Sequence, residues 1–328
     1  MKQMLMVVAM LAVMVAGLAA PAIAQIKGDF DSLYVDAARA WGDNSCAQLG
    51  DGTTTQRNTS VAVKNMNRVS DIAAGECLSL ALKTDGTVWT VKGSSPVQVS
   101  GLSGVKAIAA GGAHNLALKT DGTVWAWGDN TFGQLGDGST TEHSNTPVQA
   151  KNLSGVKAIA AGEDYSLALK TDGTVLAWGY NWAGQLGDGT ITNRYTPVAV
   201  KNLSGVSDIA AGRAHSLALK TDGAVRAWGD NSRGQLGNDI GTTRYTPAVV
   251  SGVGGASAIT AGYKHSLALK TDGTVRAWGD NSKGQLGDGS TATRNTPVQV
   301  SNLGMVKALA AGEFHSLAIV KEEKEFTQ

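Results

Sequence analysis

The chain is poor in several kinds of residue, and each shortage excludes a class of protein. Of its 328 residues, 17% are charged, 5% are aromatic, six are proline and two are cysteine, whereas 42 are glycine. This composition excludes collagen, a coiled coil and a disordered tail. It also disfavours helices, because each glycine inside a helix costs about 1 kcal/mol relative to alanine.

An excess of charge of either sign is also missing. The 28 Lys and Arg residues nearly balance the 27 Asp and Glu residues, so that the formal net charge is +1. Such a balance supplies no electrostatic attraction to nucleic acid or to an anionic membrane surface. We therefore expect neither of them as a partner.

A long apolar run opens the chain. Lys2 precedes this run, residues 4–20, and Ala22-Ile23-Ala24 follows it. This order is typical of a signal peptide, and it predicts cleavage after residue 24 and export to the periplasm or the medium. Because the run is slightly long, an uncleaved membrane anchor is the alternative. The mature chain would be formally neutral, without a membrane span.

Most of the chain consists of one repeat of about 50 residues. Each repeat contains an Ala-Ala-Gly or Thr-Ala-Gly triplet, then His-Ser-Leu-Ala-Leu-Lys-Thr-Asp-Gly, Val-x-Ala-Trp-Gly-Asp-Asn, Gly-Gln-Leu-Gly and Thr-Pro-Val, or variants of these. The triplet glycines are Gly75, Gly111, Gly162, Gly212, Gly262 and Gly312. A period of this length, made of short strands and turns, is typical of a propeller or a solenoid.

Each repeat is expected to form four strands, A to D. In one repeat, residues 105–110, 115–119 and 123–127 are strands A, B and C, and Asp-Gly between B and C favours a tight type I′ turn. Strand D begins at Thr-Pro-Val. Because proline cannot donate a ladder hydrogen bond, we expect this strand at the outer edge of its sheet. The prolines in question are Pro96, Pro147, Pro197, Pro247 and Pro297.

The two ends of the repeat region complement each other. Residues 306–320 supply strands A and B, and residues 39–44 supply strands C and D. We therefore predict an all-β propeller of six four-stranded blades, in which the terminal strands share one blade and close the ring. Seven blades are the alternative, if residues 26–37 contain a degenerate unit. The expected domains are a lead-in (25–38), the propeller (39–320) and a charged tail (321–328).

These motifs resemble the regulator of chromosome condensation repeat, over essentially all of residues 39–320. That superfamily includes secreted beta-lactamase inhibitory propellers. The resemblance implies a propeller that binds protein partners, and it usually implies seven blades. Nucleotide exchange by the nuclear members requires a cytosolic GTPase, and their chromatin binding uses a basic tail, so neither is expected of an exported chain without such a tail. Similarity to the plant ultraviolet photoreceptor is weak, because Leu176, Arg226 and Arg276 stand at the position of Trp125.

The repeated polar residues offer little chemistry. A histidine recurs before strand B, and a ring of imidazoles is a conceivable metal set, but a turn residue bonded to local backbone is the preferred interpretation. The Gly-Asp-Asn and Gly-Asp-Gly motifs lack the spacing of a calcium loop and are expected to cap their own turns. No catalytic constellation is visible, so we expect no enzyme, no cofactor and no metal. The aligned residues are His114, His215, His265 and His315, with Leu78 and Tyr165 in the other repeats.

The A–B and C–D loops are expected to open on one face, here called the loop face. Aromatic and arginine side chains in loops on a rigid scaffold are typical of binding hot spots. Tyr180 and Trp182 depart most from the repeat and are the first choice for a contact patch, with ordinary surface divergence as the alternative. The expected binding residues are Phe132, Asp164, Tyr165, Tyr180, Trp182, Arg213, Arg233, Tyr263, Lys264, Lys283 and Phe314.

Two further features belong to this face. Only residues 92–96 join strands C and D of the second unit, which predicts a lower sector of the rim, either a notch for a partner or neutral erosion. Cys46 and Cys77 fall in adjacent loops, and in an oxidising compartment we expect a disulfide between them. It would enclose roughly 30 residues and add ~3 kcal/mol of stability.

Two functions from different classes follow. The first is an exported, monomeric, non-enzymatic propeller that engages a protein or a cell-surface partner through its loop face. The second is a structural propeller of the envelope or matrix without a specific ligand. A nucleotide-exchange regulator and a propeller lyase are less favoured, the latter because no convergent acid–base groups are visible at the central channel.

Overall fold

The computed structural model describes residues 37–42, 44–76, 78–91, 95–238 and 241–321. These residues contain 24 strands in seven antiparallel sheets, five with four strands and two with two. Within this part of the chain there is no helix, and the all-β prediction is confirmed. The predicted signal peptide, most of the lead-in and most of the tail lie outside the described residues.

We number the sheets I to VII along the chain. Sheet I contains β1 (Ala37–Gly42) and β2 (Arg57–Asn67). Sheet II contains β3 (Val69–Ala74), β4 (Ser79–Lys83), β5 (Val88–Val91) and β6 (Val97–Gln98). Sheet III contains β7 (Val105–Ala110), β8 (His114–Lys119), β9 (Val124–Asp129) and β10 (His143–Gln149). Sheet IV contains β11 (Val156–Ala161), β12 (Tyr165–Lys170), β13 (Val175–Gly179) and β14 (Arg194–Ala199). Sheet V contains β15 (Val206–Ala211), β16 (His215–Lys220), β17 (Val225–Gly229) and β18 (Arg244–Val249); sheet VI contains β19 (Ala256–Ala261), β20 (His265–Lys270), β21 (Val275–Gly279) and β22 (Arg294–Gln299); sheet VII contains β23 (Met305–Ala311) and β24 (Ser316–Lys321).

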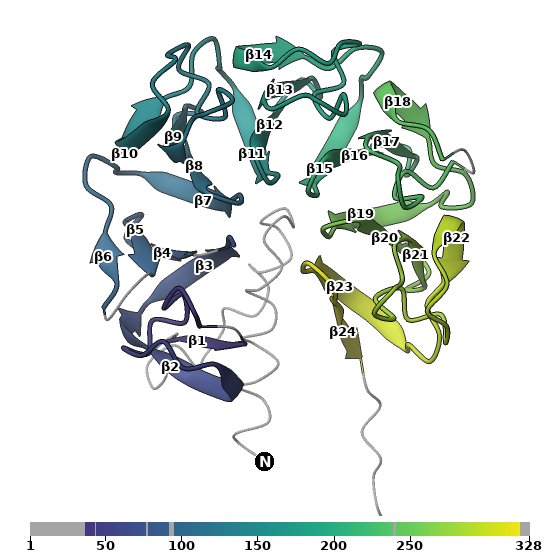
Figure 1. Cartoon of the computed structure of the whole chain (residues 1–328), viewed down its shortest axis with the longest axis horizontal. Coiled ribbons are helices and arrows are strands. Elements are labelled where there is room, and N and C mark those ends of the chain that lie inside the picture. The colour runs from purple at the N-terminus through teal and green to yellow at the C-terminus, as the bar shows by residue number, and fades with distance from the viewer. Residues whose placement is uncertain (1–36, 43, 77, 92–94, 239–240, 322–328) are drawn as a thin grey trace, which may run out of the picture.

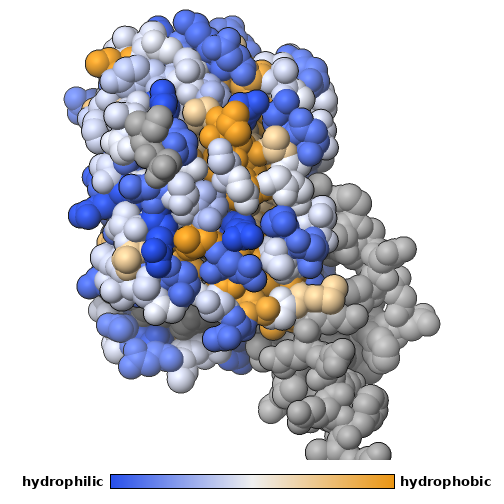
Figure 2. Space-filling view, turned by 90° about the vertical axis from the view of Figure 1, so that its right-hand side faces the viewer, coloured by the Kyte–Doolittle hydropathy of each residue, from blue (hydrophilic) through white to orange (hydrophobic). Residues whose placement is uncertain are grey.

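The sheets stand around a central axis like the blades of a propeller (Figure 1). In every four-stranded sheet the strands follow chain order, with the first strand innermost. As predicted, the outer strand contains the proline in sheets III to VI, and in sheet II Pro96 directly precedes the outer strand β6. Seen from the side of sheets V and VI, hydrophilic side chains surround smaller apolar areas on this rim (Figure 2).

The apolar core is divided among the interfaces between neighbouring sheets. One cluster joins Leu167 and Leu169 of sheet IV to Ala218 and Trp228 of sheet V, all fully buried. Equivalent clusters fill the other interfaces, so that a bulky face of one sheet meets a flatter face of the next. Each sheet is therefore stabilised mainly by its two neighbours.

The structure has seven sheets, five complete and two half-sheets, where six four-stranded blades with one blade shared by the two ends were predicted. Among the described residues β1 pairs only with β2, and β24 pairs only with β23. Sheets I and VII lie on either side of the opening in the ring (Figure 1), and each has the strands that the other lacks. The shared blade that would close the ring therefore stays a prediction.

The turn between strands B and C differs from the predicted type I′ turn. The amide of Gly122 donates to the carbonyl of Lys119 at 3.0 Å, and only the glycine of the turn has positive φ, at 81°. Asp121 keeps negative φ because its carboxylate accepts the amide hydrogen of Thr123 at 2.9 Å. The result is a three-residue hairpin loop with glycine in the left-handed position, repeated in the other sheets.

Candidate binding surface

The repeated motif fastens each sheet to the next. The main-chain carbonyl of Gln134, in the C–D loop of sheet III, accepts hydrogen bonds from Oγ of Ser166 at 2.9 Å and from Nε1 of Trp178 at 2.8 Å, both in sheet IV. Gln185 and Gln235 serve the next two interfaces in the same way. The Gln, Ser and Trp positions of the repeat thus form hydrogen bonds between neighbouring sheets, which accounts for their recurrence.

The histidines belong to the same fastening, which corrects the prediction that they bond to local backbone. Nε2 of His114 lies 2.9 Å from Oγ of Ser166 in the next sheet. Because the hydroxyl hydrogen of Ser166 is used on Gln134, Nε2 of His114 must be the donor. Burial lowers the pKa of His114 to about 4. Within the described residues, no group of three or more His, Cys, Asp or Glu side chains has the arrangement of a metal site.

Tyr165 is a second correction, because it does not lie on the loop face. Its side chain is fully buried, and its hydroxyl donates to the carbonyl of His215 at 2.5 Å. Ser216 Oγ lies 2.9 Å from the same hydroxyl. Tyr165 therefore replaces histidine in the fastening between sheets IV and V and cannot contact a partner.

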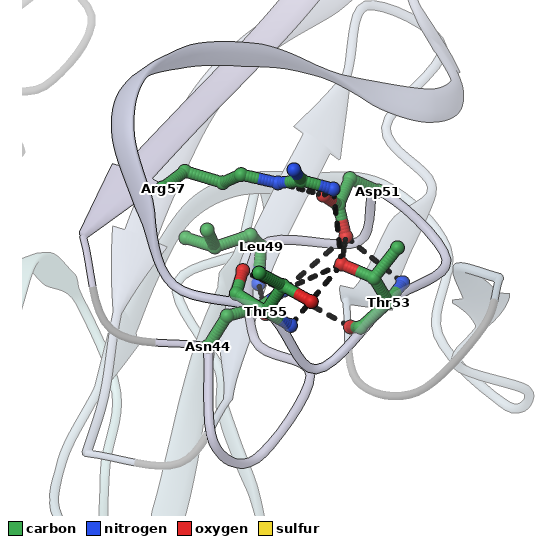
Figure 3. Close-up of polar contacts among 6 residues, drawn as sticks. All are labelled: Asn44, Leu49, Asp51, Thr53, Thr55 and Arg57. Atoms are coloured by element: carbon green, nitrogen blue, oxygen red, sulfur yellow. Dashed lines mark hydrogen bonds and ion pairs between the residues drawn. The ribbon is translucent and has the colours of Figure 1, made fainter.

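The Asp and Asn residues cap their own loops, as expected. In the loop after β1, Nδ2 of Asn44 donates to the carbonyls of Thr53 and Thr55 at 3.0 and 3.1 Å, and Asp51 pairs with Arg57 at 2.6 Å (Figure 3). The hydroxyl of Thr53 and the guanidinium of Arg57 hold the pKa of Asp51 well below its ordinary value, although burial acts against them. The carboxylate of Asp51 is therefore engaged by hydrogen bonds and an ion pair within its own loop.

The A–B and C–D loops lie together on one face, as predicted. The amide of Asp129 donates to the carbonyl of Ala113 at 2.9 Å, and the amide of Tyr180 donates to that of Asp164 at 2.9 Å. Nearer the axis, the A–B turns also bond to one another from sheet to sheet, since the amide of Glu163 donates to the carbonyl of Arg213 at 3.4 Å. The loop face is therefore a continuous, hydrogen-bonded surface.

An inner group of side chains on this face is engaged within the chain. The guanidinium of Arg213 pairs with Glu163 at 2.6 Å and lies 4.8 Å from the ring centre of Tyr263. The ring of Tyr263 in turn lies 5.8 Å from that of Phe314, which is 44% exposed. The predicted residues Arg213, Tyr263 and Phe314 thus come together, and Phe314 is the exposed member of this inner group.

A second aromatic group lies on the C–D loops of sheets III and IV. The rings of Phe132 and Tyr180 stack at 4.0 Å with an angle of 21°. In sheet V the residue at the position of Tyr180 is Asp230, which accepts a hydrogen bond from Gln235. Tyr180 has no carboxylate for such a bond, and its ring packs on Phe132 of the preceding loop. Trp182, two residues further on, is 50% exposed. We call Phe132, Tyr180 and Trp182 the aromatic patch.

Carboxylates adjoin the aromatic patch. The pKa of Asp164 is raised to about 6, first by burial and then by repulsion from Glu163, Asp129 and Glu76. Glu163 was not among the predicted binding residues, although its place in the variable A–B turn was the signal that could have found it. The face near the patch therefore carries negative potential, and Asp164 titrates near neutral pH.

The remaining predicted residues are spread over the face. Arg233 and Lys283 are exposed at equivalent points of the next two C–D loops, and Lys264 is half-buried in an A–B turn. Among the described residues none of these three side chains forms an ion pair, and because they belong to sheets V and VI they form a basic sector apart from the aromatic patch of sheets III and IV. Cys77 lies outside the described residues, so the predicted disulfide with Cys46 is not tested.

Comparison with known proteins identifies the class. The model of the RCC1-like domain matches residues 37–327, and the chain belongs to this family. Curated relatives include the ultraviolet-B receptor UVR8 of Arabidopsis thaliana, 28% identical over 47% of this chain and 28% of that protein, and the human E3 ubiquitin-protein ligase HERC2, 30% identical over 50% of this chain and 3% of that protein. The chain thus spans much less than two thirds of the length of these relatives.

Solved structures agree with this assignment at the level of the fold. The crystal structure of Prp20p from Saccharomyces cerevisiae, described together with its binding to Gsp1p and histones, is similar with a TM-score of 0.75 and 24% identity. The match covers 88% of this chain and 78% of that one. Separately, the described residues include no helix that is long and apolar enough to span a membrane.

Proposed function

We propose that this chain is an exported, non-enzymatic propeller that binds a protein or cell-surface partner through its loop face. The observation that carries the proposal is the aromatic patch, in which Trp182 is half exposed and Phe132 stacks on Tyr180 in the neighbouring C–D loops. Large aromatic side chains held on rigid loops are the residues that most often dominate binding energy. Export rests on the sequence of residues 1–24 alone.

The test is a pull-down from envelope extract and culture fluid with the mature protein and with a Tyr180→Ala/Trp182→Ala variant. We expect a specific partner that the variant loses while its melting temperature stays unchanged. The matched control is Met305→Ala, since Met305 is 65% exposed and lies beside the Gly273 turn on the opposite face. Equal recovery of the same proteins by all three forms would contradict the proposal and favour a structural envelope protein.

The disulfide between Cys46 and Cys77 is part of the proposal, because it requires an oxidising compartment. Its support is that no free cysteine occurs among the described residues. Alkylation of the purified exported protein without reductant, followed by mass spectrometry, should find both thiols blocked. Two free thiols would refute the pairing.

A further inference from the structure

The outer strand of sheet I lacks the proline that the outer strands of sheets III to VI contain. β2 begins Arg-Asn-Thr-Ser-Val-Ala, whereas β22 reads Arg-Asn-Thr-Pro-Val-Gln, so Ser60 takes the place of Pro297. Proline on an edge strand removes a hydrogen-bond donor and so discourages pairing with another chain. Sheet I is without this protection. The aligned prolines of the other three sheets are Pro147, Pro197 and Pro247.

The repeat places this proline where the main chain faces away from its own sheet. In sheet IV the amide of Val200 donates to the carbonyl of Val175 at 3.0 Å. Because main-chain groups alternate in direction along a strand, Val198 also faces the neighbouring strand, and Pro197 faces outward. An N–H group at this position would therefore lie on the open edge of the sheet.

Sheet I has such an N–H group. Val61 pairs with the alanine of β1 as Val198 pairs with the alanine of β13, so Ser60 and Ala62 both direct their main-chain groups outward. Both residues are exposed. Nη1 of Arg39 lies 3.4 Å from the carbonyl oxygen of Ser60, a long contact made by an exposed side chain, which a partner strand can displace.

The segment at this edge can pair with a copy of itself. Its sequence, Thr-Ser-Val-Ala-Val, contains no charge, proline or glycine, and threonine and valine favour strands. In an antiparallel pair centred on Val61, Ser60 of each chain faces Ala62 of the other, and each of them can donate its N–H to the carbonyl of the other. The nearest charged residue, Lys64, falls opposite Asn58, so that no like charges meet.

We propose that the outer edge of β2 is an interaction surface for a second copy of this chain, and that antiparallel pairing of β2 with β2 forms a twofold symmetric dimer. The uncharged segment supplies both halves of the contact, and every hydrogen bond between the copies occurs twice. β2 lies on the outer side of β1 in sheet I (Figure 1), whereas the aromatic patch belongs to sheets III and IV. The dimer therefore goes beyond the proposed function, and it replaces the monomer expected from the sequence.

Sedimentation equilibrium of the mature protein measures the association. We expect the native chain to form a dimer, and Ser60→Pro should raise the dissociation constant at least about tenfold, since it removes a donor from both halves of the contact. The melting temperature should stay unchanged, because sheets III to VI accommodate proline at this position. Ser60→Ala is the matched control, since it keeps the main-chain N–H and should dimerise like the native chain.

A cross-link tests the register. Val61 lies on the twofold axis, and the Cα atoms of such a non-hydrogen-bonded pair are about 4.5 Å apart, within the range of a disulfide. Val61→Cys should therefore give a covalent dimer on oxidation, linked through position 61 by mass spectrometry. Thr59→Cys is the control and should not cross-link, because position 59 falls opposite Val63.

Three results would overturn the proposal. The first is a native chain that stays monomeric at every concentration, and the second is a Val61→Cys chain that gives no covalent dimer. The third is a Ser60→Pro chain that dimerises as tightly as the native one, which would assign the contact to another edge such as that of β24.

Discussion

At the residue scale, one substitution in the C–D loop of sheet V removes an ion pair that the C–D loop of sheet VI contains. In sheet VI, Asp288 pairs with Arg294 at 2.7 Å. In sheet V the corresponding residues are Asn238 and Arg244, and the buried Nε of Arg244 has no hydrogen-bond partner. A neutral amide thus stands where the repeat provides a carboxylate, and the loop loses a charge-assisted hydrogen bond.

Asn238→Asp should therefore stabilise the protein by about 1 kcal/mol, since the new carboxylate can accept from a half-buried guanidinium. Urea denaturation followed by tryptophan fluorescence measures the change. Asp288→Asn is the matched control and should lower the free energy of unfolding by a similar amount. An Asn238→Asp variant that is no more stable than the native chain would contradict the expectation.

The buried histidines make stability depend on pH. Burial lowers the pKa of His215 to about 3, whereas an unfolded histidine titrates near 6.5. Below about pH 6.5 the unfolded chain therefore binds a proton that the folded chain does not, and the stability due to neutral His215 falls as the pH falls. The carboxyl of Asp208, whose pKa burial raises to about 7, has the opposite effect.

A comparison with His215→Gln isolates this contribution, because Asp208 is present in both proteins and cancels. We expect the stability advantage of the native chain over the variant to shrink by about 2 kcal/mol between pH 7 and pH 5. Urea denaturation at both pH values provides the measurement. A difference that does not vary with pH would mean that His215 has the same pKa in the folded protein as in the unfolded chain.

At the element scale, the strands and their order followed from the repeat, whereas the contacts between sheets did not. Alternation of large and small residues predicts a strand from its own neighbours, and five prolines at one position predict the outer edge. The partner of His114 lies 52 residues away in the next sheet, so no local pattern names it. The signal that existed was the recurrence of His, Ser, Gln and Trp at fixed spacing in most repeats, and to interpret it one needs the register of the sheets.

Ser266→Ala tests this fastening. Ser266 is fully buried, donates to the carbonyl of Gln235 at 2.9 Å and accepts from His215 at 3.0 Å. Its loss leaves the buried Nε2–H of His215 without an acceptor and removes one of the two hydrogen bonds to the carbonyl of Gln235, and we expect the free energy of unfolding to fall by about 2 kcal/mol. Ser257→Ala in the same sheet is the control, since that hydroxyl bonds only to Leu269 of the neighbouring strand, and it should cost less than about 1 kcal/mol. Equal effects of the two changes would contradict the fastening.

At the scale of the whole molecule, the repeat defines the register in which β24 would pair with β1 if the ring closes. β16 and β17 pair Leu217 with Ala227, and the corresponding residues of the half-sheets are Leu317 in β24 and Ala40 in β1. Leu317 is 37% exposed, whereas Leu217 is fully buried. The sequence could indicate which strands each end supplies, but pairing between ends almost 280 residues apart depends on the geometry of the whole ring.

An Ala40→Cys/Leu317→Cys variant should form an intramolecular cross-link on oxidation, mapped by mass spectrometry, if β24 pairs with β1. Closure covers the edge of β24, which would otherwise be open to pairing with another chain. Ala40→Cys/Leu217→Cys is the control and should not cross-link. A cross-linked dimer in place of the intramolecular product would show that β24 pairs between molecules and that the ring stays open.

The fastening described between sheets also determines how the molecule comes apart. Each sheet bonds to its two neighbours, so cooperativity passes along the ring from one sheet to the next, as it does in a repeat array. Sheets III to VI are linked by three or more side-chain hydrogen bonds at each interface, and sheets II and III are not. We therefore expect local opening to separate sheets I and II from the remaining sheets before sheets III to VI part from one another.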